Sequence, residues 1–190
     1  IDLVAATEHG VMVVNTAGFV TEQGANQTIM MLLACAKKLT VLHDLVRAGR
    51  WEAEARVQVL DLPPIDGQVL GLVGLGNISR ATALRAKVFG LQVIAYDPYV
   101  PTWTAKEYRV EVVHTLNELA SRSDYVSMHT PLNDETSKLA GEAFFRAMKP
   151  TAYFINTTRG GTVDERALVR ALQNSEIAGA GIDVFEKEPT

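Results

Sequence analysis

The chain has 190 residues, of which 47% are hydrophobic and 21% charged, and its formal net charge is −4 at pH 7. This composition is typical of a folded globular protein with its own core, so we do not expect disorder. The sequence lacks the cluster of Lys and Arg that a nucleic-acid surface needs, and it lacks a run of about 18 apolar residues that would cross a membrane. We therefore expect small-molecule partners, with no nucleic acid and no membrane.

The single cysteine, Cys35, lies in the apolar run 30–36. One cysteine excludes an intrachain disulfide and fits a reducing compartment. The first residues lack the charged-then-apolar layout of a signal peptide, so we expect a cytoplasmic protein. The chain begins at Ile1 and stops after Pro189 and Thr190, and we expect that it is cut at both ends.

Helical spacing dominates the first part of the chain. From Thr21 to Ala48 apolar residues recur every three or four positions, which predicts one long helix or two in succession. Segment 51–66 has no clean period, and we expect an irregular arm there. The helix and the arm carry more apolar residues than one domain needs, which favours a homodimer built on segment 21–66. The alternative is that these residues face another domain.

After Gly67 short β-rich runs alternate with helical stretches. We expect strands at Val69–Gly74, Val93–Tyr96, Tyr125–His129, Tyr153–Asn156 and Ala178–Asp183, and helices at Ile78–Phe89, Leu116–Ala120, Gly141–Met148 and Glu165–Gln173. Parallel strands need a crossover connection, which is usually a helix. The alternation therefore predicts an α/β fold with a doubly wound parallel sheet.

The loop after the first expected strand carries a glycine pattern in a strand-to-helix context. Gly74 suits a sharp turn, and Gly76 lets the backbone approach a pyrophosphate. The helix-start amides of Asn77 and Ile78 can then bind the anion. Ser79 replaces the third glycine of the pattern, and because serine is small we expect it to be tolerated. For the loop alone, a glycine-rich turn that binds nothing is the alternative.

Asp97 follows the second expected strand, about 20 residues after Gly76. A carboxylate at this place accepts the hydroxyls of an adenosine ribose and repels a 2′-phosphate. The loop and the acid together predict NAD rather than NADP as the cofactor. We assign residues 16–190 to a dinucleotide-binding domain and residues 1–15 to the remnant of a substrate domain and its crossover.

Six ordered motifs resemble those of the D-isomer-specific 2-hydroxyacid dehydrogenases, and they extend over nearly all of the chain. They are Asn15–Gly18, Gly74–Ile78, Tyr96–Tyr99, His129–Leu132, Ile155–Gly161 and Asp183–Pro189. The resemblance implies a Rossmann-like NAD-binding domain. It also implies an oxidoreductase that transfers a hydride between NAD(H) and a D-2-hydroxy or 2-oxo acid, with a phosphoglycerate-, hydroxypyruvate- or glyoxylate-type substrate.

For catalysis, the resemblance implies that Arg159 binds the carboxylate and keto group of the substrate and that Glu188 pairs with a catalytic histidine. A guanidinium suits this role because it grips a carboxylate with two parallel hydrogen bonds. A solvated arginine and an exposed acid in a turn are the alternatives for these two residues. The family's acid–base histidine would lie beyond Thr190, so we expect this chain alone to bind cofactor without turnover.

For the cofactor, the resemblance implies that Thr130 and Pro131 line the adenosine pocket. Thr157 and Thr158 would lie along the cofactor near the bend, and Asp183 would contact its nicotinamide side. No metal site is expected.

Two other functions remain open from the residues. One is an NAD-sensing binding protein, similar to transcriptional corepressors of the same fold. The other is a different NAD enzyme, such as a homocysteine hydrolase, that shares the loop and the acid. The sequence does not indicate which hydroxy acid is used.

Overall fold

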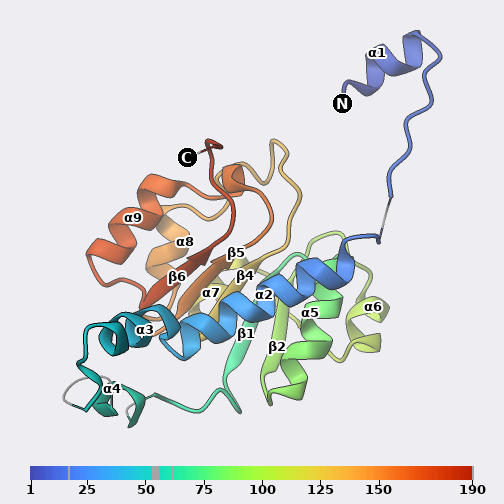
Figure 1. Cartoon of the computed structure of the whole chain (residues 1–190). Helices are drawn as coiled ribbons and strands as arrows, with labels where there is room; N and C mark the ends of the chain where they lie inside the picture. The colour runs from blue at the N-terminus through green and yellow to red at the C-terminus, as the bar shows by residue number, and fades with distance from the viewer. Residues whose placement is uncertain (17, 53–55, 61, 190) are drawn as a thin grey trace.

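Six parallel strands form one sheet with the order β3-β2-β1-β4-β5-β6 (Figure 1). The computed structural model describes residues 1–16, 18–52, 56–60 and 62–189. The strands are β1 (Val69–Val73), β2 (Gln92–Tyr96), β3 (Glu111–Val112), β4 (Tyr125–Met128), β5 (Tyr153–Asn156) and β6 (Gly179–Ile182). The strand order reverses between β1 and β4, and ligands of open α/β sheets bind at the carboxyl ends of the strands at such a switch point.

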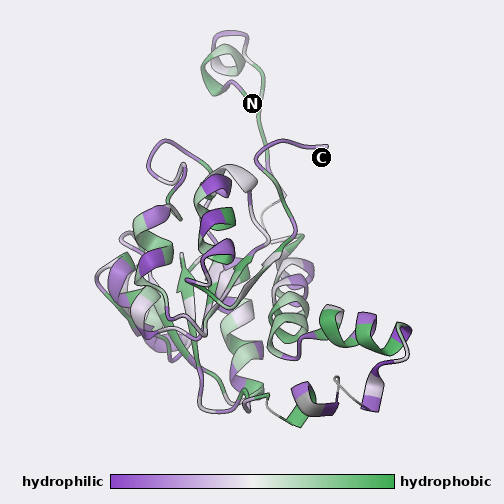
Figure 2. Cartoon of the chain, turned by 90° about the vertical axis from the view of Figure 1, so that its left-hand side faces the viewer, coloured by the Kyte–Doolittle hydropathy of each residue, from purple (hydrophilic) through white to green (hydrophobic). Residues whose placement is uncertain are grey.

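Helices cover both faces of the sheet (Figure 1). The helices are α1 (Leu3–Glu8), α2 (Thr21–Ala36), α3 (Leu39–Arg47), α4 (Arg56–Leu60), α5 (Asn77–Val88), α6 (Thr102–Glu107), α7 (Leu116–Arg122), α8 (Glu142–Ala147) and α9 (Glu165–Gln173). One core cluster joins α2 and α5 to the sheet, and the other joins α7, α8 and α9 to the opposite face. Figure 2 shows hydrophobic residues along the central strands and both kinds of residue on the surrounding helices.

Helix α2 belongs to the core of the domain. Ala25, Ile29, Leu32 and Ala36 form one buried stripe at helical spacing, and α2 contacts α5, β5 and β6. Burying a side chain such as Leu32 stabilises a fold by about 1.5–3 kcal/mol. Most of the apolar surface of α2 is therefore used inside the domain, which leaves less of it for a dimer interface than the sequence suggested.

The predicted α/β fold with a doubly wound parallel sheet is confirmed, and so are the five expected strands. The helical stretch 21–48 consists of two helices, α2 and α3. They are separated at Lys38, whose backbone is left-handed with a φ of 49°. The arm is not wholly irregular, because it contains α4. Strand β3 and helices α1 and α6 were not predicted; β3 has only two residues, and each of the two helices has six. Ala17 of the first motif and residues 53–55 and 61 of the arm lie outside the described residues.

The N-terminal segment extends away from the sheet (Figures 1 and 2). No residue of α1, which is described throughout, is buried. Along the described part, apolar side chains such as Val11, Met12 and Val14 are exposed. This arrangement is compatible with a division near residue 15, which stays a prediction. None of the described helices is long and apolar enough to span a bilayer.

Candidate cofactor-binding and active site

Gly74 ends β1 in a conformation that requires glycine. Its φ is +95°, and its N–H donates to the carbonyl oxygen of Tyr96 at 2.8 Å. A Cβ added there would lie 2.9 Å from the carbonyl oxygen of His129. Gly74 therefore allows the ends of β1 and β4 to approach each other closely.

Gly76 leaves open space at the start of α5. It is the N-cap residue, and as a glycine it has no side chain that could cap the helix-start amides. A Cβ built on Gly76 would meet no atom of the described residues within 4 Å. The amides of Asn77 and Ile78 and the positive end of the helix dipole thus face a space that a pyrophosphate fits.

Ser79 stabilises the loop rather than loosening it. Its side chain is fully buried, and its hydroxyl donates to the carbonyl oxygen of Gly74 at 2.6 Å. The departure from the third glycine therefore adds a contact between α5 and the turn after β1.

Asp97 holds two loops together at the end of β2. Its Oδ2 accepts from the N–H of Leu75 at 2.8 Å, and its Oδ1 accepts from those of Tyr99 and Val100 at 2.9 and 3.1 Å. The carboxylate is thus fixed beside the glycine loop. Each carboxylate oxygen has two lone pairs, so one acceptor site remains on Oδ2 for a ribose hydroxyl.

Two adjoining cavities of about 710 and 210 Å³ follow the carboxyl ends of β1, β4 and β5. Both are lined by Val20, Ile78 and His129. The larger is also lined by Gly24, Thr130, Pro131, Leu132, Thr157, Thr158 and Arg159, and the smaller by Gly18, Thr21, Gly76, Asn77 and Ser79. The cleft therefore brings most of the predicted cofactor residues together with Arg159.

The loop that carries Arg159 is ordered by a buried amide. Asn156 donates from Nδ2 to the carbonyl oxygen of Arg159 at 3.1 Å, and its Oδ1 accepts from the N–H and the Oγ1 of Thr158 at 3.1 and 2.9 Å. The exposed guanidinium donates from Nη1 to the carbonyl oxygen of Thr158 at 2.7 Å. Within the described ranges, no carboxylate forms an ion pair with Arg159, so its remaining N–H groups can bind an anion.

Two side-chain hydrogen bonds join helix α2 to the segments that follow β5 and β6. The hydroxyls of Thr28 and Thr157 lie 3.0 Å apart, and Gln27 donates to Oδ1 of Asp183 at 2.8 Å. Thr157 lines the larger cavity, and its position along the cofactor stays a prediction. Asp183 is next to the cleft, at the end of β6, although it does not line the cavities.

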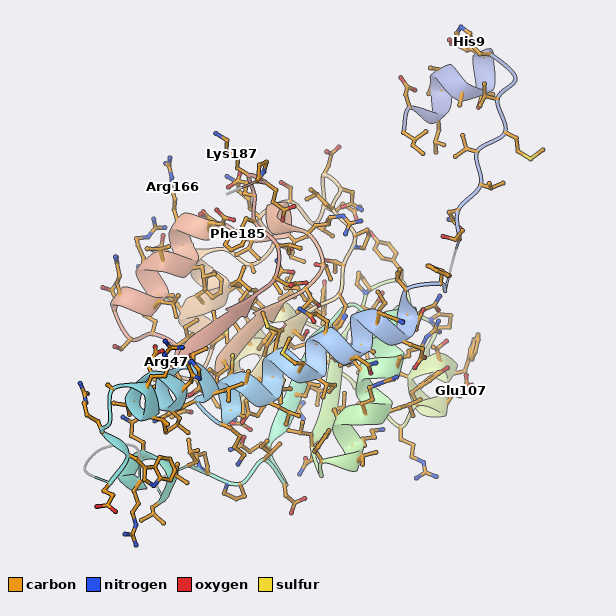
Figure 3. All side chains as sticks on the ribbon, in the orientation of Figure 1. His9, Arg47, Glu107, Arg166, Phe185 and Lys187 are labelled. Atoms are coloured by element: carbon orange, nitrogen blue, oxygen red, sulfur yellow. The ribbon has the colours of Figure 1, made fainter. Side chains whose placement is uncertain are left out.

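Glu188 lies in the segment that packs on the Arg159 loop. A Cβ on Gly160 would come within 1.9 Å of the carbonyl carbon of Phe185, so the two backbones are in close contact. Figure 3 shows Phe185 at the carboxyl edge of the sheet. The carboxylate of Glu188 accepts from the N–H of Phe185 at 2.8 Å and is exposed. The pairing of Glu188 with a histidine stays a prediction.

His129 begins the motif His129–Leu132, and the resemblance implies a cofactor-side position for it, which stays a prediction. Its Nε2 lies 3.0 Å from Oγ of Ser127. Nδ1 of His129 and Oγ1 of Thr130 are buried without a hydrogen-bond partner in the part of the chain that the structure describes. Burial lowers the pKa of His129 to about 4, so the ring is neutral at pH 7. Its position directly after a strand, at the edge of a parallel sheet where ligands bind, agrees with that expectation.

These features fit a dinucleotide. The space over Gly76 has room for a pyrophosphate, Asp97 is fixed beside the loop, and two buried polar atoms of cleft residues have no hydrogen-bond partner among the described residues. The described residues contain no group of three or more His, Cys, Asp and Glu that could hold a metal ion.

Comparisons with known proteins agree with this arrangement. Residues 29–190 match the family described as D-isomer specific 2-hydroxyacid dehydrogenase, NAD binding domain. The chain is 42% identical to a glyoxylate reductase of Korarchaeum cryptofilum and 38% identical to a D-3-phosphoglycerate dehydrogenase of Methanocaldococcus jannaschii, with all of this chain covered. It covers 57% and 35% of those proteins, so the chain spans about half or less of their length.

A solved structure shows the same fold. The holo form of D-mandelate dehydrogenase from Rhodotorula graminis superposes with a TM-score of 0.90 at 33% identity. The superposition covers 100% of this chain and 56% of that one. NAD is the cofactor of this family of domains. The chain therefore belongs to the D-isomer-specific 2-hydroxyacid dehydrogenase family and forms its Rossmann-like NAD-binding domain.

Proposed function

We propose that the whole protein transfers a hydride between NAD(H) and a D-2-hydroxy or 2-oxo acid. The observation that carries the proposal is the cleft that joins the uncapped start of α5 to an arginine without an ionic partner among the described residues. The relatives reported above are reductases and dehydrogenases of this class, and none supports the alternative of an NAD-sensing binding protein.

In this proposal the first half of the cleft holds the cofactor. The amides of Asn77 and Ile78 bind the pyrophosphate across Gly74 and Gly76, and Asp97 accepts from a hydroxyl of the adenosine ribose. Bound NAD supplies or accepts the hydride.

Other residues would hold the remainder of the cofactor. Thr130 and Pro131 line the adenosine side. Thr157 and Thr158 lie along the cofactor near its bend, and Asp183 contacts the nicotinamide side. The buried hydroxyl of Thr130 has no hydrogen-bond partner among the described residues, which supports a ligand contact there.

The Arg159 end of the larger cavity binds the substrate. Arg159 grips the carboxylate with a bidentate contact, and its loop is held by Asn156, so little ordering is needed on binding. Glu188 would raise the basicity of a histidine that this chain does not supply. Among the described histidines only His129 lines the cleft, and its lowered pKa makes it a poor base at pH 7. We therefore propose that the 190-residue chain alone binds NADH without turnover.

We also propose a cytoplasmic homodimer with the domain division near residue 15. The exposed apolar side chains of α3 and the arm support the dimer, because Leu39, Val46, Trp51 and Leu60 have exposed fractions of 58%, 52%, 48% and 79%. Helix α2 contributes little to this surface apart from Met30.

Two glycines that cap helices offer a matched test of the cofactor site. Gly76 and Gly141 are the N-cap residues of α5 and α8, and both have extended backbone with negative φ. Gly76→Ala introduces a Cβ into the pyrophosphate space and should abolish NADH binding in calorimetric titration, with little loss of stability. Gly141→Ala is the control for the cap and should bind NADH normally. Normal NADH binding by folded Gly76→Ala would contradict the assigned site.

The reaction itself is tested with the full-length enzyme on a panel of 2-oxo acids. NADH-dependent reduction of at least one of them to the D-hydroxy acid is the expected result. Intact NADH binding without reduction of any member of the panel would overturn the proposed activity.

A further inference from the structure

Glu165, the first residue of α9, bonds to the turn that carries Glu188. Its Oε1 accepts from the N–H of Glu186 at 2.5 Å, and the two residues are 21 positions apart in the sequence. Glu165 is partly buried, and within the ranges that the structure describes it forms no ion pair. Its carboxylate therefore binds the backbone of another segment rather than a basic side chain.

The start of α9 gives Glu165 a fixed support. The side chain of Asp164 accepts from the N–H of Ala167, and the N–H of Asp164 donates to the carbonyl oxygen of Ala140 at 3.0 Å. Ala140 also forms a parallel bridge with Val163. The positive end of the helix dipole favours a carboxylate in the first turn. Glu165 is thus a charged acceptor in an ordered place.

The turn 185–188 has few other contacts that could hold it. The bond from the N–H of Phe185 to Glu188, at 2.8 Å, lies within the turn itself. Nζ of Lys138 lies 3.5 Å from the carboxylate of Glu186, but both side chains are exposed, and such an ion pair contributes little. Among the described residues, the bond to Glu165 is the only hydrogen bond from residues 184–189 to another part of the chain.

The segment 159–165 carries both Arg159 and Glu165. Within it, the fully buried Thr162 donates from its hydroxyl to the carbonyl oxygen of Arg159 at 2.7 Å. A hydrogen bond from the end of this segment to the turn therefore sets where Glu188 lies relative to Arg159. Loss of that bond would let the turn move while the Arg159 loop keeps its own contacts.

We propose that Glu165 is a positioning residue, which fixes Glu188 relative to Arg159 by accepting from the N–H of Glu186. This inference rests on the proposed function, in which Arg159 binds the substrate and Glu188 pairs with a histidine that this chain does not supply. Misplacement of a reacting group by about 1 Å can cost about a hundredfold in rate. A residue that acts through Glu188 should therefore affect turnover and leave cofactor binding unchanged.

The test uses the full-length enzyme with a 2-oxo acid that the wild type reduces, and unfolding curves are measured alongside. Glu165→Ala removes the acceptor and should lower kcat by about ten- to a hundredfold, with NADH affinity unchanged. Glu165→Gln keeps an oxygen at the same position and should recover most of the rate. Glu165→Asp withdraws the acceptor by one carbon, should fall between the two, and gives the same readout if Glu165→Ala does not fold.

Glu142→Ala is the matched control. It also removes an acid from the first turn of a helix, in this case α8, and Glu142 forms ion pairs with Arg146 and Arg170 rather than a bond to the turn. It should leave kcat unchanged.

A double-mutant cycle with Glu188 gives a readout that a purely structural role would not move. Glu188→Gln keeps an acceptor for the N–H of Phe185 and removes the charge that would make the histidine more basic. Residues that act as a unit are not additive, so adding Glu165→Ala to Glu188→Gln should cause little further loss of kcat. If Glu165 only stabilised the fold, the two losses would multiply.

Normal kcat in folded Glu165→Ala, or losses that multiply in the double variant, would overturn the inference. A Glu165→Gln variant as slow as Glu165→Ala would overturn it too, because the charge and not the hydrogen bond would then matter. If the wild type reduces no 2-oxo acid, or if Glu188→Gln has normal kcat, the proposed function or the role of Glu188 in it fails instead, so the two failures are distinct.

Discussion

The hydroxyl of Ser79 donates to the carbonyl oxygen of Gly74 at 2.6 Å, from inside α5 to the turn after β1. The pair joins the helix to the loop that the cofactor would meet. A serine in place of the third glycine is therefore a stabilising feature here.

Replacing Ser79 by Ala should lower the free energy of unfolding by about 1 kcal/mol, because the buried carbonyl loses a partner. NADH binding should also weaken, since the loop is less firmly held. Ser79→Gly should lower the free energy of unfolding by about 1 kcal/mol more than Ser79→Ala does, because glycine is less favourable than alanine within a helix. Urea unfolding and calorimetry measure the two effects.

Thr82→Val is the control for this change. It removes a buried hydroxyl of the same helix, one that bonds to the carbonyl oxygen of Ile78 rather than to the loop. It should lower stability without altering NADH affinity. An equal loss of NADH affinity in both variants would refute a specific role for the Ser79–Gly74 contact.

The wild-type chain should bind NADH more tightly than NADPH, because the carboxylate of Asp97 repels a 2′-phosphate. Asp97→Asn should reduce the difference between the NADH and NADPH affinities, because it removes the negative charge. The amide oxygen of Asn can still accept from some of the three backbone N–H groups that bond to Asp97. Glu107→Gln removes a charge from the exposed surface of α6 and should leave the preference unchanged (Figure 3). Equal affinities of the wild type for NADH and NADPH would contradict the assignment of Asp97 as the acid that contacts the adenosine ribose.

In the full-length enzyme Arg159→Ala should reduce kcat/KM for a 2-oxo acid by at least a hundredfold, since a bidentate contact to a charged substrate is worth about 3 kcal/mol or more. NADH affinity should stay within a few-fold. Arg159→Lys should recover little, because a point charge cannot reproduce the planar fork. Arg166→Ala, on the exposed side of α9, is the control (Figure 3). Normal turnover by either Arg159 variant would exclude the role.

Sedimentation of the chain at micromolar concentration should show a dimer rather than a species of 20.7 kDa. Trp51→Glu places a charge in the proposed interface and should dissociate it. Trp103→Glu is a matched control, because Trp103 is 66% exposed on α6, on the opposite side of the molecule from α3 and α4 (Figure 1). A wild-type monomer would rule the dimer out for this chain.

The hydroxyl of Tyr99 donates to the carboxylate of Glu135, which joins the loops after β2 and β4. This bond, together with the negative charge of Glu135, raises the pKa of Tyr99. The contribution of the contact to stability is therefore fully present below the ordinary tyrosine pKa of about 10 and is lost as the pH rises through the raised value. Glu135→Gln should lower the pKa of Tyr99, measured by NMR of labelled tyrosine. An unchanged titration would show that the pair does not form in solution.

Local patterns in the sequence were sufficient to predict the frame of this protein. The bounds of α9 agree with the prediction because Asp164 accepts a hydrogen bond from the N–H of Ala167 at the start of the helix, and the buried stripe that follows repeats at helical spacing. The glycines and Asp97 were found for the same reason, since a tight turn and its acid are encoded within a short stretch. The short elements β3 and α6 lacked such a pattern.

What the sequence alone determined is therefore the alternation of strands and helices, the glycine loop, and the membership of the motifs in one family. Only the tertiary structure decided that Ser79 bonds to Gly74 and that the apolar stripe of α2 packs inside the domain. It also decided that His129 is neutral, with Nε2 next to Ser127 and Nδ1 buried without a hydrogen-bond partner among the described residues. The physical reason is that periodicity reports whether a residue is buried, whereas its partners come from contacts between distant segments, and those contacts set which polar atoms are satisfied and which remain to bind a ligand.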